Sequence, residues 1–137
     1  MLDLKSRGVP ITAVGLQAHL NGSVEIDKEG VSAFCAEMTR AGLDVLITEL
    51  DVNDYDLPGD TGQRDALVAK RTADFLSAVF AGCRPKLICT WGITDRQTWM
   101  PMWFKRRDGM PNRPLPLDAD FAEKPMLRVI RAYCGGV

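Results

Sequence analysis

Two acidic residues, Glu49 and Asp51, are the strongest candidates for chemistry in this chain. They stand in the segment Val-Leu-Ile-Thr-Glu-Leu-Asp-Val, whose apolar residues predict a buried strand. Because successive side chains of a strand point to opposite faces, the two carboxyl groups are expected on the same side. A carboxylate held there needs hydrogen-bonding partners. The competing interpretation is a strand that ends in solvent with two surface acids.

A single histidine, His19, is a candidate partner for these acids. It follows Gln17 by two positions, at the end of an apolar segment that precedes the Glu49 strand. A histidine beside two carboxylates can hydrogen-bond to a nucleophile and tune its charge. The competing interpretation is a structural histidine. A third possibility is a divalent metal site, since Gln17, His19, Glu49 and Asp51 offer one histidine and three oxygen donors.

Two tryptophans flank a polar turn further along the chain. Trp91 and Trp99 stand eight positions apart around Gly-Ile-Thr-Asp-Arg-Gln-Thr. Indole rings can stack on the flat apolar faces of sugars, and they also fill hydrophobic cores. The spacing alone supports both interpretations equally.

The elements that must position these residues alternate between strand and helix. Apolar runs predict strands at residues 13–17, 44–50 and 86–91, of the kind found in a parallel sheet buried on both faces. Amphipathic patterns predict helices near residues 31–38, 67–80 and 125–133, and residues 1–8 resemble the end of another helix. Gly42 and Gly82 fit helix stop signals. This rhythm predicts an α/β fold.

The polar candidates all follow the carboxyl ends of the predicted strands. In a (β/α)8 barrel those positions face the active-site mouth. Such a barrel typically needs eight βα units and about 250 residues, whereas this chain has 137 residues and three units. A truncated barrel reconciles the rhythm with the length.

Composition argues against several classes of partner. Lys and Arg number 17 against 18 Asp and Glu, and the formal net charge of -1 gives no electrostatic case for binding nucleic acid or an anionic membrane. No apolar run reaches the length of a membrane span, and the N-terminus lacks the apolar region of a signal peptide.

The four cysteines do not predict a zinc site, because none forms a CxxC pair and only one histidine is present. Cys35 and Cys89 are expected to be small core residues. A disulfide between Cys83 and Cys89 cannot be decided from sequence.

Three segments together resemble glycoside hydrolase family 10, the endo-β-1,4-xylanases. Residues 9–20 are similar to that family's sixth barrel strand, residues 45–52 to the seventh strand with its nucleophile, and residues 90–99 to the eighth. The segments Pro-Leu-Pro-Leu-Asp (114–118) and Lys124-Pro125 are similar to the family's closing segment. The resemblance implies that residues 1–137 are the C-terminal portion of a (β/α)8 catalytic domain, its last three βα units.

The resemblance also implies catalytic roles. Glu49 matches the nucleophile of a retaining endo-1,4-β-xylanase, which works by double displacement through a covalent glycosyl-enzyme. Asp51 and His19 match the hydrogen-bonded pair that orients and polarises the nucleophile. Gln17 matches a residue that lines the same subsite near the sugar hydroxyls.

Substrate and cofactor expectations follow from the same resemblance. Trp91 and Trp99 match the aromatic residues that frame the sugar just before the cleaved bond, and Arg96 lies in the matching loop as a further substrate-binding candidate. The expected ligand is xylan or a xylo-oligosaccharide, with no cofactor and no metal. Xylan is too large to enter a cell, so a secreted or periplasmic parent enzyme is expected.

The sequence departs from the family in one respect. The family's acid/base glutamate lies in an Asn-Glu dipeptide at the end of the fourth strand, and this chain contains no such dipeptide. We therefore expect a fragment with little or no activity of its own, whose natural partner is the missing N-terminal half of the barrel. A non-catalytic carbohydrate-binding remnant that uses Trp91 and Trp99 is the alternative.

Overall fold

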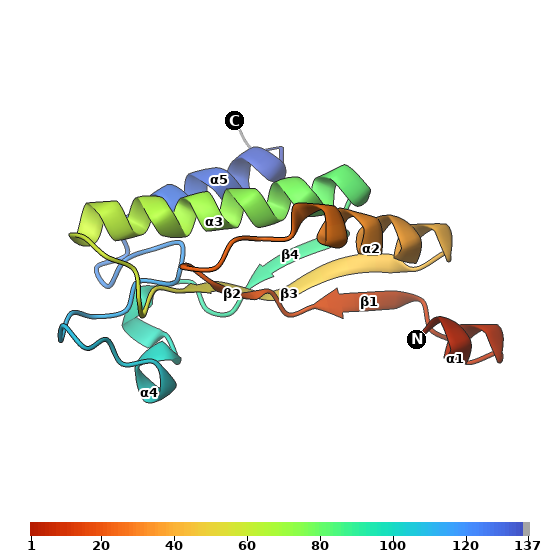
Figure 1. Cartoon of the computed structure of the whole chain (residues 1–137), viewed down its shortest axis with the longest axis horizontal. Coiled ribbons are helices and arrows are strands. Elements are labelled where there is room, and N and C mark those ends of the chain that lie inside the picture. Colours follow the sequence, from red (N-terminus) through yellow and green to blue (C-terminus); the bar gives the residue numbers. More distant parts are fainter. Residues whose placement is uncertain (136–137) are drawn as a thin grey trace.

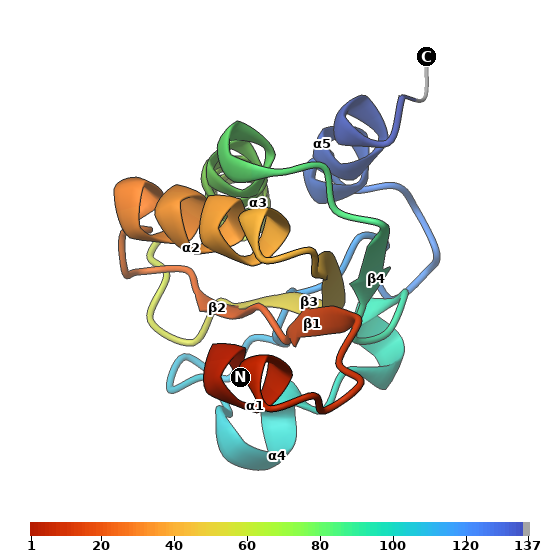
Figure 2. The same ribbon diagram turned by 90° about the vertical axis from the view of Figure 1, so that its right-hand side faces the viewer.

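A computed structural model describes residues 1–135 as two layers. Helices α2, α3 and α5 cover one face of a sheet, and the short helices α1 and α4 lie on the other side of it (Figure 1 and Figure 2). The elements in chain order are α1 (Leu2–Ser6), β1 (Ala13–Leu16), β2 (His19–Asn21), α2 (Lys28–Arg40), β3 (Asp44–Asn53), α3 (Thr61–Gly82), β4 (Leu87–Thr90), the 3-10 turn η1 (Asp95–Gln97), α4 (Met100–Trp103) and α5 (Pro125–Tyr133).

The sheet is parallel and is built around β3. β1 pairs with the first half of β3, with Ala13 opposite Asp44, and β2 pairs with its last residues, with His19 opposite Asp51. β4 pairs along the other side of β3. Within the described residues, β1 and β4 each have one unpaired edge.

The core lies between β3 and the helices. α3 packs along α2 and α5, and its buried stripe meets the apolar side chains of β3. At its start, Asp60 and Gln63 form a reciprocal capping box, which satisfies two backbone N–H groups. The fully or nearly fully buried apolar residues of this core include Cys35, Met38, Val45, Ile47, Leu50, Val52, Val68, Leu76, Val79 and Met126.

The predicted α/β fold is confirmed, and the largest differences in element bounds are at β3, β2 and α3. β3 continues to Asn53, because its end pairs with β2. β2 itself has only three residues, too few to give a periodic signal. It is separated from β1 by Gln17 and Ala18, and the φ of 62° at Ala18 interrupts the strand. α3 begins at Thr61, six residues before the first apolar position of the predicted helix, because its first turn is polar.

The cysteines correct one expectation and decide another. Cys35 is buried as predicted, but Cys89 is exposed, because its side of β4 is not covered by the helical layer. Cys83 and Cys89 are both free thiols. The Cys83 thiol instead contacts Cys35, and burial together with this neighbour raises the pKa of Cys35 to about 12.

Candidate active site

His19 joins two carboxylates at the carboxyl end of the sheet. Its Nδ1 lies 2.9 Å from Asp51 Oδ1, and its Nε2 lies 3.1 Å from Glu49 Oε2. The cause is the strand register, which sets His19 beside Asp51, while the two-residue period of β3 brings Glu49 to the same side. Both ring nitrogens are therefore engaged by acids that lie far from His19 in the sequence.

The remaining oxygens of the two carboxylates also have partners. The Gln17 side-chain amide donates to Glu49 Oε1 at 3.3 Å, and the Trp99 indole N–H donates to Asp51 Oδ2 at 2.8 Å. Asp51 is fully buried, whereas Glu49 keeps part of its surface in contact with solvent. This difference suits a buried acid that orients the site and an accessible acid that reacts.

The electrostatics follow from this burial and pairing. Burial alone would lower the pKa of His19, but the hydrogen bonds and negative charges of Asp51, and then of Glu49, outweigh it and raise the pKa above its ordinary value. Burial also raises the pKa of Asp51, and the hydrogen bonds from Trp99 and His19 counter part of that rise. A protonated His19 places a positive charge 3.1 Å from Glu49 Oε2.

Two indoles enclose the imidazole. Trp91 meets His19 edge-on with ring centroids 6.1 Å apart, and Trp99 meets it at 5.4 Å. Trp91 is 48% exposed, so its ring has a free surface beside Glu49 and His19. Trp99 is partly buried and is fixed by its bond to Asp51. An exposed indole next to a carboxylate cluster is a surface on which a sugar ring can stack.

Arg96 makes its contacts elsewhere in the loop. Its guanidinium lies 3.5 Å from Asp120 and over the ring of Phe121, and neither of these residues belongs to the Glu49 cluster. The adjacent Asp95 turns inward, where its carboxylate accepts hydrogen bonds from Lys124 at 2.8 Å and from the Leu115 backbone at 3.0 Å. Asp95 thus holds the loop that carries the tryptophans.

A divalent metal site fits this geometry poorly. Among residues 1–135, no group of three or more His, Cys, Asp or Glu side chains is arranged to hold a metal ion. Both nitrogens of His19 already bond carboxylates, which leaves neither free to ligate. The same part of the chain also has no helix long and apolar enough to cross a membrane.

Sequence reasoning missed two features that support the site. It treated Trp99 as a sugar contact and did not foresee its bond to Asp51, for which no local signal exists. It also missed a buried ionic group beyond β3, in which Asp54 accepts hydrogen bonds from Arg64 at 3.0 Å and from Asn112 at 3.0 Å. No local pattern in the sequence marks this group, because Asp54, Arg64 and Asn112 lie far apart in the chain.

Parallel strands with a carboxylate cluster at their carboxyl ends, backed by helices, define part of a (β/α)8-barrel enzyme. Residues 1–133 match the family described as Glycosyl hydrolase family 10, and the chain belongs to that family.

The chain resembles curated relatives along most of its length. It is 30% identical over 124 residues to "Exoglucanase XynX" of Acetivibrio thermocellus, covering 89% of this chain and 10% of that protein. It is 29% identical over 133 residues to "Endo-1,4-beta-xylanase B" of Thermotoga neapolitana, covering 94% of this chain and 36% of that protein. The chain therefore spans between about a tenth and a third of these relatives.

Solved structures give the same result. Native xylanase 10B from Thermotoga maritima superimposes with a TM-score of 0.83 at 25% identity, covering 98% of this chain and 40% of that one. Xylanase 10B from Thermotoga petrophila, solved in complex with xylobiose, also gives a TM-score of 0.83 at 25% identity, covering 98% of this chain and 39% of that one. The partial-barrel prediction is confirmed by these coverages.

Proposed function

We propose that this chain is the nucleophile-bearing part of a retaining endo-1,4-β-xylanase. The observation that carries the proposal is the pairing of both Glu49 oxygens, one with Gln17 and one with His19, in a partly exposed carboxylate at the barrel mouth. Relatives named endo-1,4-beta-xylanase and a xylobiose-bound structural neighbour support the substrate class.

The chemistry requires two displacements. In the first, Glu49 forms a bond to the anomeric carbon as the glycosidic C–O bond breaks, and a second carboxyl group gives its proton to the leaving oxygen. In the second, that carboxylate takes a proton from a water molecule as the water oxygen bonds to the anomeric carbon and the bond from that carbon to Glu49 breaks. His19 and Asp51 act as positioning residues: His19 holds Glu49 through its Nε2, and Asp51 fixes the orientation of His19 through its Nδ1.

The second carboxyl group has to come from further polypeptide. Retaining enzymes hold the two groups about 5–5.5 Å apart. The other glutamates of this chain, Glu25, Glu29, Glu37 and Glu123, are exposed on α2 or in loops, and none bonds to the cluster. We propose that strands added at the free edges of β1 and β4 supply the acid/base group, as the N-terminal portion of the barrel.

A complementation experiment tests this proposal. The purified 137-residue chain is assayed for reducing-sugar release from xylan, alone and with a separately produced polypeptide that carries the first five βα units of a family 10 xylanase. We expect release only in the mixture. Glu49→Ala should abolish it, whereas Glu37→Ala, an exposed glutamate on α2, should leave it unchanged.

Covalent trapping identifies the nucleophile directly. An activated 2-fluoro-xyloside incubated with the active mixture should leave its sugar on the peptide that contains Glu49, as read by mass spectrometry. A label on another carboxylate would refute the assignment of Glu49. Release by the isolated wild-type chain that disappears in Glu49→Ala would refute the need for a second polypeptide.

A non-catalytic carbohydrate-binding role is the second candidate, and the exposed Trp91 ring favours it. Under this alternative the chain binds xylo-oligosaccharides, binding survives Glu49→Ala, and no mixture hydrolyses xylan. Both candidates act on a polymer that does not enter cells, so we also propose that the parent protein works outside the cytoplasm.

A further inference from the structure

Helix α4 exposes two large apolar side chains in succession. Met102 is 76% exposed and Trp103 is 72% exposed, the highest values among the large apolar side chains of residues 1–135. An indole presented to water to this extent offers an apolar surface that a ligand can cover. The roles proposed for Glu49, Trp91 and Trp99 do not involve it.

Trp103 follows the site residue Trp99 by one helical turn. It stands four positions after Trp99, and the backbone bonds from Met102 N–H to Trp99 O and from Phe104 N–H to Met100 O make this stretch helical. Residues four apart share one side of a helix, and helical side chains lean toward its N-terminus. The Trp103 indole is thus carried on the same side of the turn as Trp99, which bonds Asp51.

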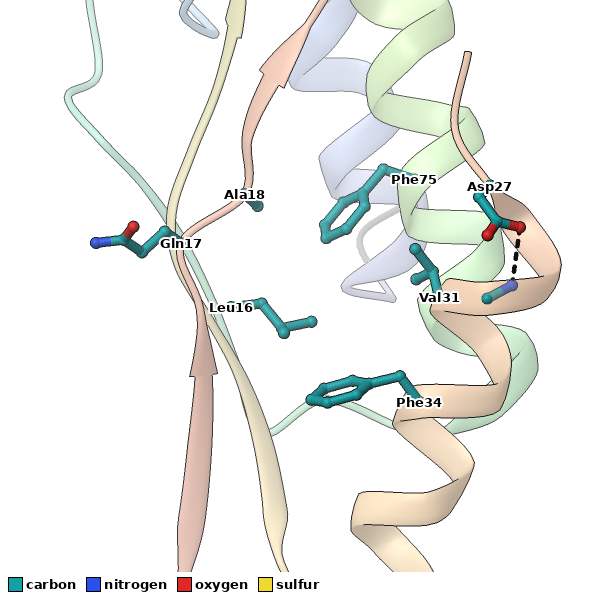
Figure 3. A pocket seen from close by; sticks show the side chains of 8 residues that line it. Leu16, Gln17, Ala18, Asp27, Val31, Phe34 and Phe75 are labelled. Carbon is teal, nitrogen blue, oxygen red and sulfur yellow. Dashed lines mark hydrogen bonds between the residues drawn. The ribbon is translucent and has the colours of Figure 1, made fainter. Parts of the chain in front are cut away.

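Helix α4 and the Glu49 side chain lie on the same side of the sheet. α4 lies on the side of the sheet opposite α2, α3 and α5 (Figure 1 and Figure 2). In the close view of the apolar pocket between the sheet and α2, Gln17 points away from Phe34 and Phe75 and so away from the helical layer (Figure 3). Gln17 bonds Glu49, so the reactive carboxylate and α4 belong to the same face.

The turn that carries Trp103 is anchored at three points. Met100 is buried, and Phe104 packs edge-on against Trp99 with ring centroids 5.8 Å apart. Just beyond the turn, the Arg106 guanidinium donates a hydrogen bond to Leu57 O in the segment between β3 and α3, at 3.1 Å. An aromatic ring on a fixed turn loses little conformational freedom when a ligand stacks on it.

We propose that Trp103 is a further sugar-binding platform, which takes a pyranose ring of a β-1,4-linked xylose chain beyond the ring held at Trp91 and Trp99. The C–H groups on one face of a xylopyranose would cover the exposed indole, and the ring hydroxyls would stay in water. This inference rests on the proposed function, because it assumes that the Glu49 cluster binds the same sugar chain.

Calorimetric titration of the full 137-residue chain with xylobiose and with xylohexaose tests the platform. The wild type should bind xylohexaose more tightly than xylobiose. Trp103→Ala should lower the affinity for xylohexaose about tenfold, a loss typical of one aromatic contact, and leave that for xylobiose unchanged. Trp103→Phe should recover most of the loss. Phe34→Ala, which removes an aromatic ring from the opposite face, should change neither affinity.

The outcomes separate the two proposals. Equal xylohexaose affinity in the wild type and Trp103→Ala, or an equal loss for both ligands, would overturn the platform and leave the proposed function standing. Trp91→Ala should lower the affinity of the chain for both xylobiose and xylohexaose. No binding of either ligand to the wild type, or no effect of Trp91→Ala, would overturn the proposed sugar site itself and the platform with it. Thermal unfolding of each variant shows that a loss is not due to misfolding.

Discussion

At the scale of single residues, the candidate site depends on His19. Its two nitrogens contact a buried carboxylate, Asp51, and a partly exposed one, Glu49, so a proton on the imidazole is shared between two acidic partners. The imidazole is also fixed between two indole rings. The charge of this one side chain therefore decides whether Glu49 has a cationic neighbour.

The first prediction concerns the titration of His19. As the only histidine, it gives an unambiguous NMR signal, and its midpoint should lie above the ordinary value of 6.5. Asp51→Asn should lower the midpoint, and Glu49→Gln should lower it less, because the contribution of Asp51 is the larger. A wild-type midpoint at or below 6.5 would contradict the geometry.

The same shift makes stability depend on pH. A histidine whose pKa is raised on folding contributes stability that is fully present below the unfolded pKa and is lost as the pH rises through the folded pKa. The difference in free energy of unfolding between the wild type and His19→Gln should therefore shrink as the pH is raised from below 6.5 to above the folded midpoint, measured by urea denaturation.

The bond from Trp99 to Asp51 gives a further prediction. Trp99→Phe removes the N–H donor at 2.8 Å from a fully buried carboxylate, which should cost about 1–3 kcal/mol of stability and raise the pKa of Asp51 further. Trp91→Phe is the control, since Trp91 is exposed and has no such bond, and it should be close to neutral. If urea denaturation gave equal losses in the free energy of unfolding for Trp99→Phe and Trp91→Phe, the hydrogen bond from Trp99 to Asp51 would contribute little to stability.

At the scale of elements, the close approach of α2 and α3 fixes how the helical layer lies on the sheet. Gly82, the last residue of α3, lies directly against α2, and a Cβ there would sit 2.2 Å from the Ser32 carbonyl oxygen and 2.9 Å from Cys35 Cβ. The main obstacle is backbone, which cannot rotate away. A side chain at this position must push the two helices apart.

A pair of glycine substitutions tests this packing. Gly82→Ala should destabilise the chain by about 1–3 kcal/mol through overpacking. Gly62→Ala, in the first turn of the same helix, meets nothing nearer than 3.5 Å and should stabilise it by about 0.5–1 kcal/mol. Thermal and urea unfolding of both variants would measure the contrast. Similar changes in the free energy of unfolding for the two variants would mean that α2 shifts to accommodate the added methyl group at position 82 without cost.

At the scale of the whole molecule, buried charges join distant segments. Asp54, just beyond β3, bonds Arg64 of α3 and Asn112 of the long segment before α5, and it lies 3.8 Å from Arg106. Arg64 is only 1% exposed, so it depends on this carboxylate for its charge balance. The group ties the loop that follows α4 to the sheet and to α3.

Removing Asp54 should therefore affect the entire fold. Asp54→Ala leaves Arg64 buried without its carboxylate and should cost about 3–5 kcal/mol, seen as a large drop in the urea midpoint. Asp74→Ala is the matched control, because its two close partners, Lys28 and Lys70, have exposed side chains, and the buried Arg71, 3.7 Å away, keeps its hydrogen bond to Gly22 O. That loss should stay below about 1 kcal/mol. A comparable drop in both variants would argue against a special role for the buried group.

The sequence by itself determined the α/β rhythm, the buried β3 and the candidate residues Glu49, Asp51, His19 and Gln17. These follow from local patterns: apolar periodicity, helix stop signals and polar residues at strand ends. The tertiary structure decided the rest, because it depends on contacts between segments far apart in the sequence. The register of β2 set His19 against Asp51, Trp99 turned inward to that acid, Arg96 pointed to Asp120, and Cys89 faced the side of the sheet that the helices leave open.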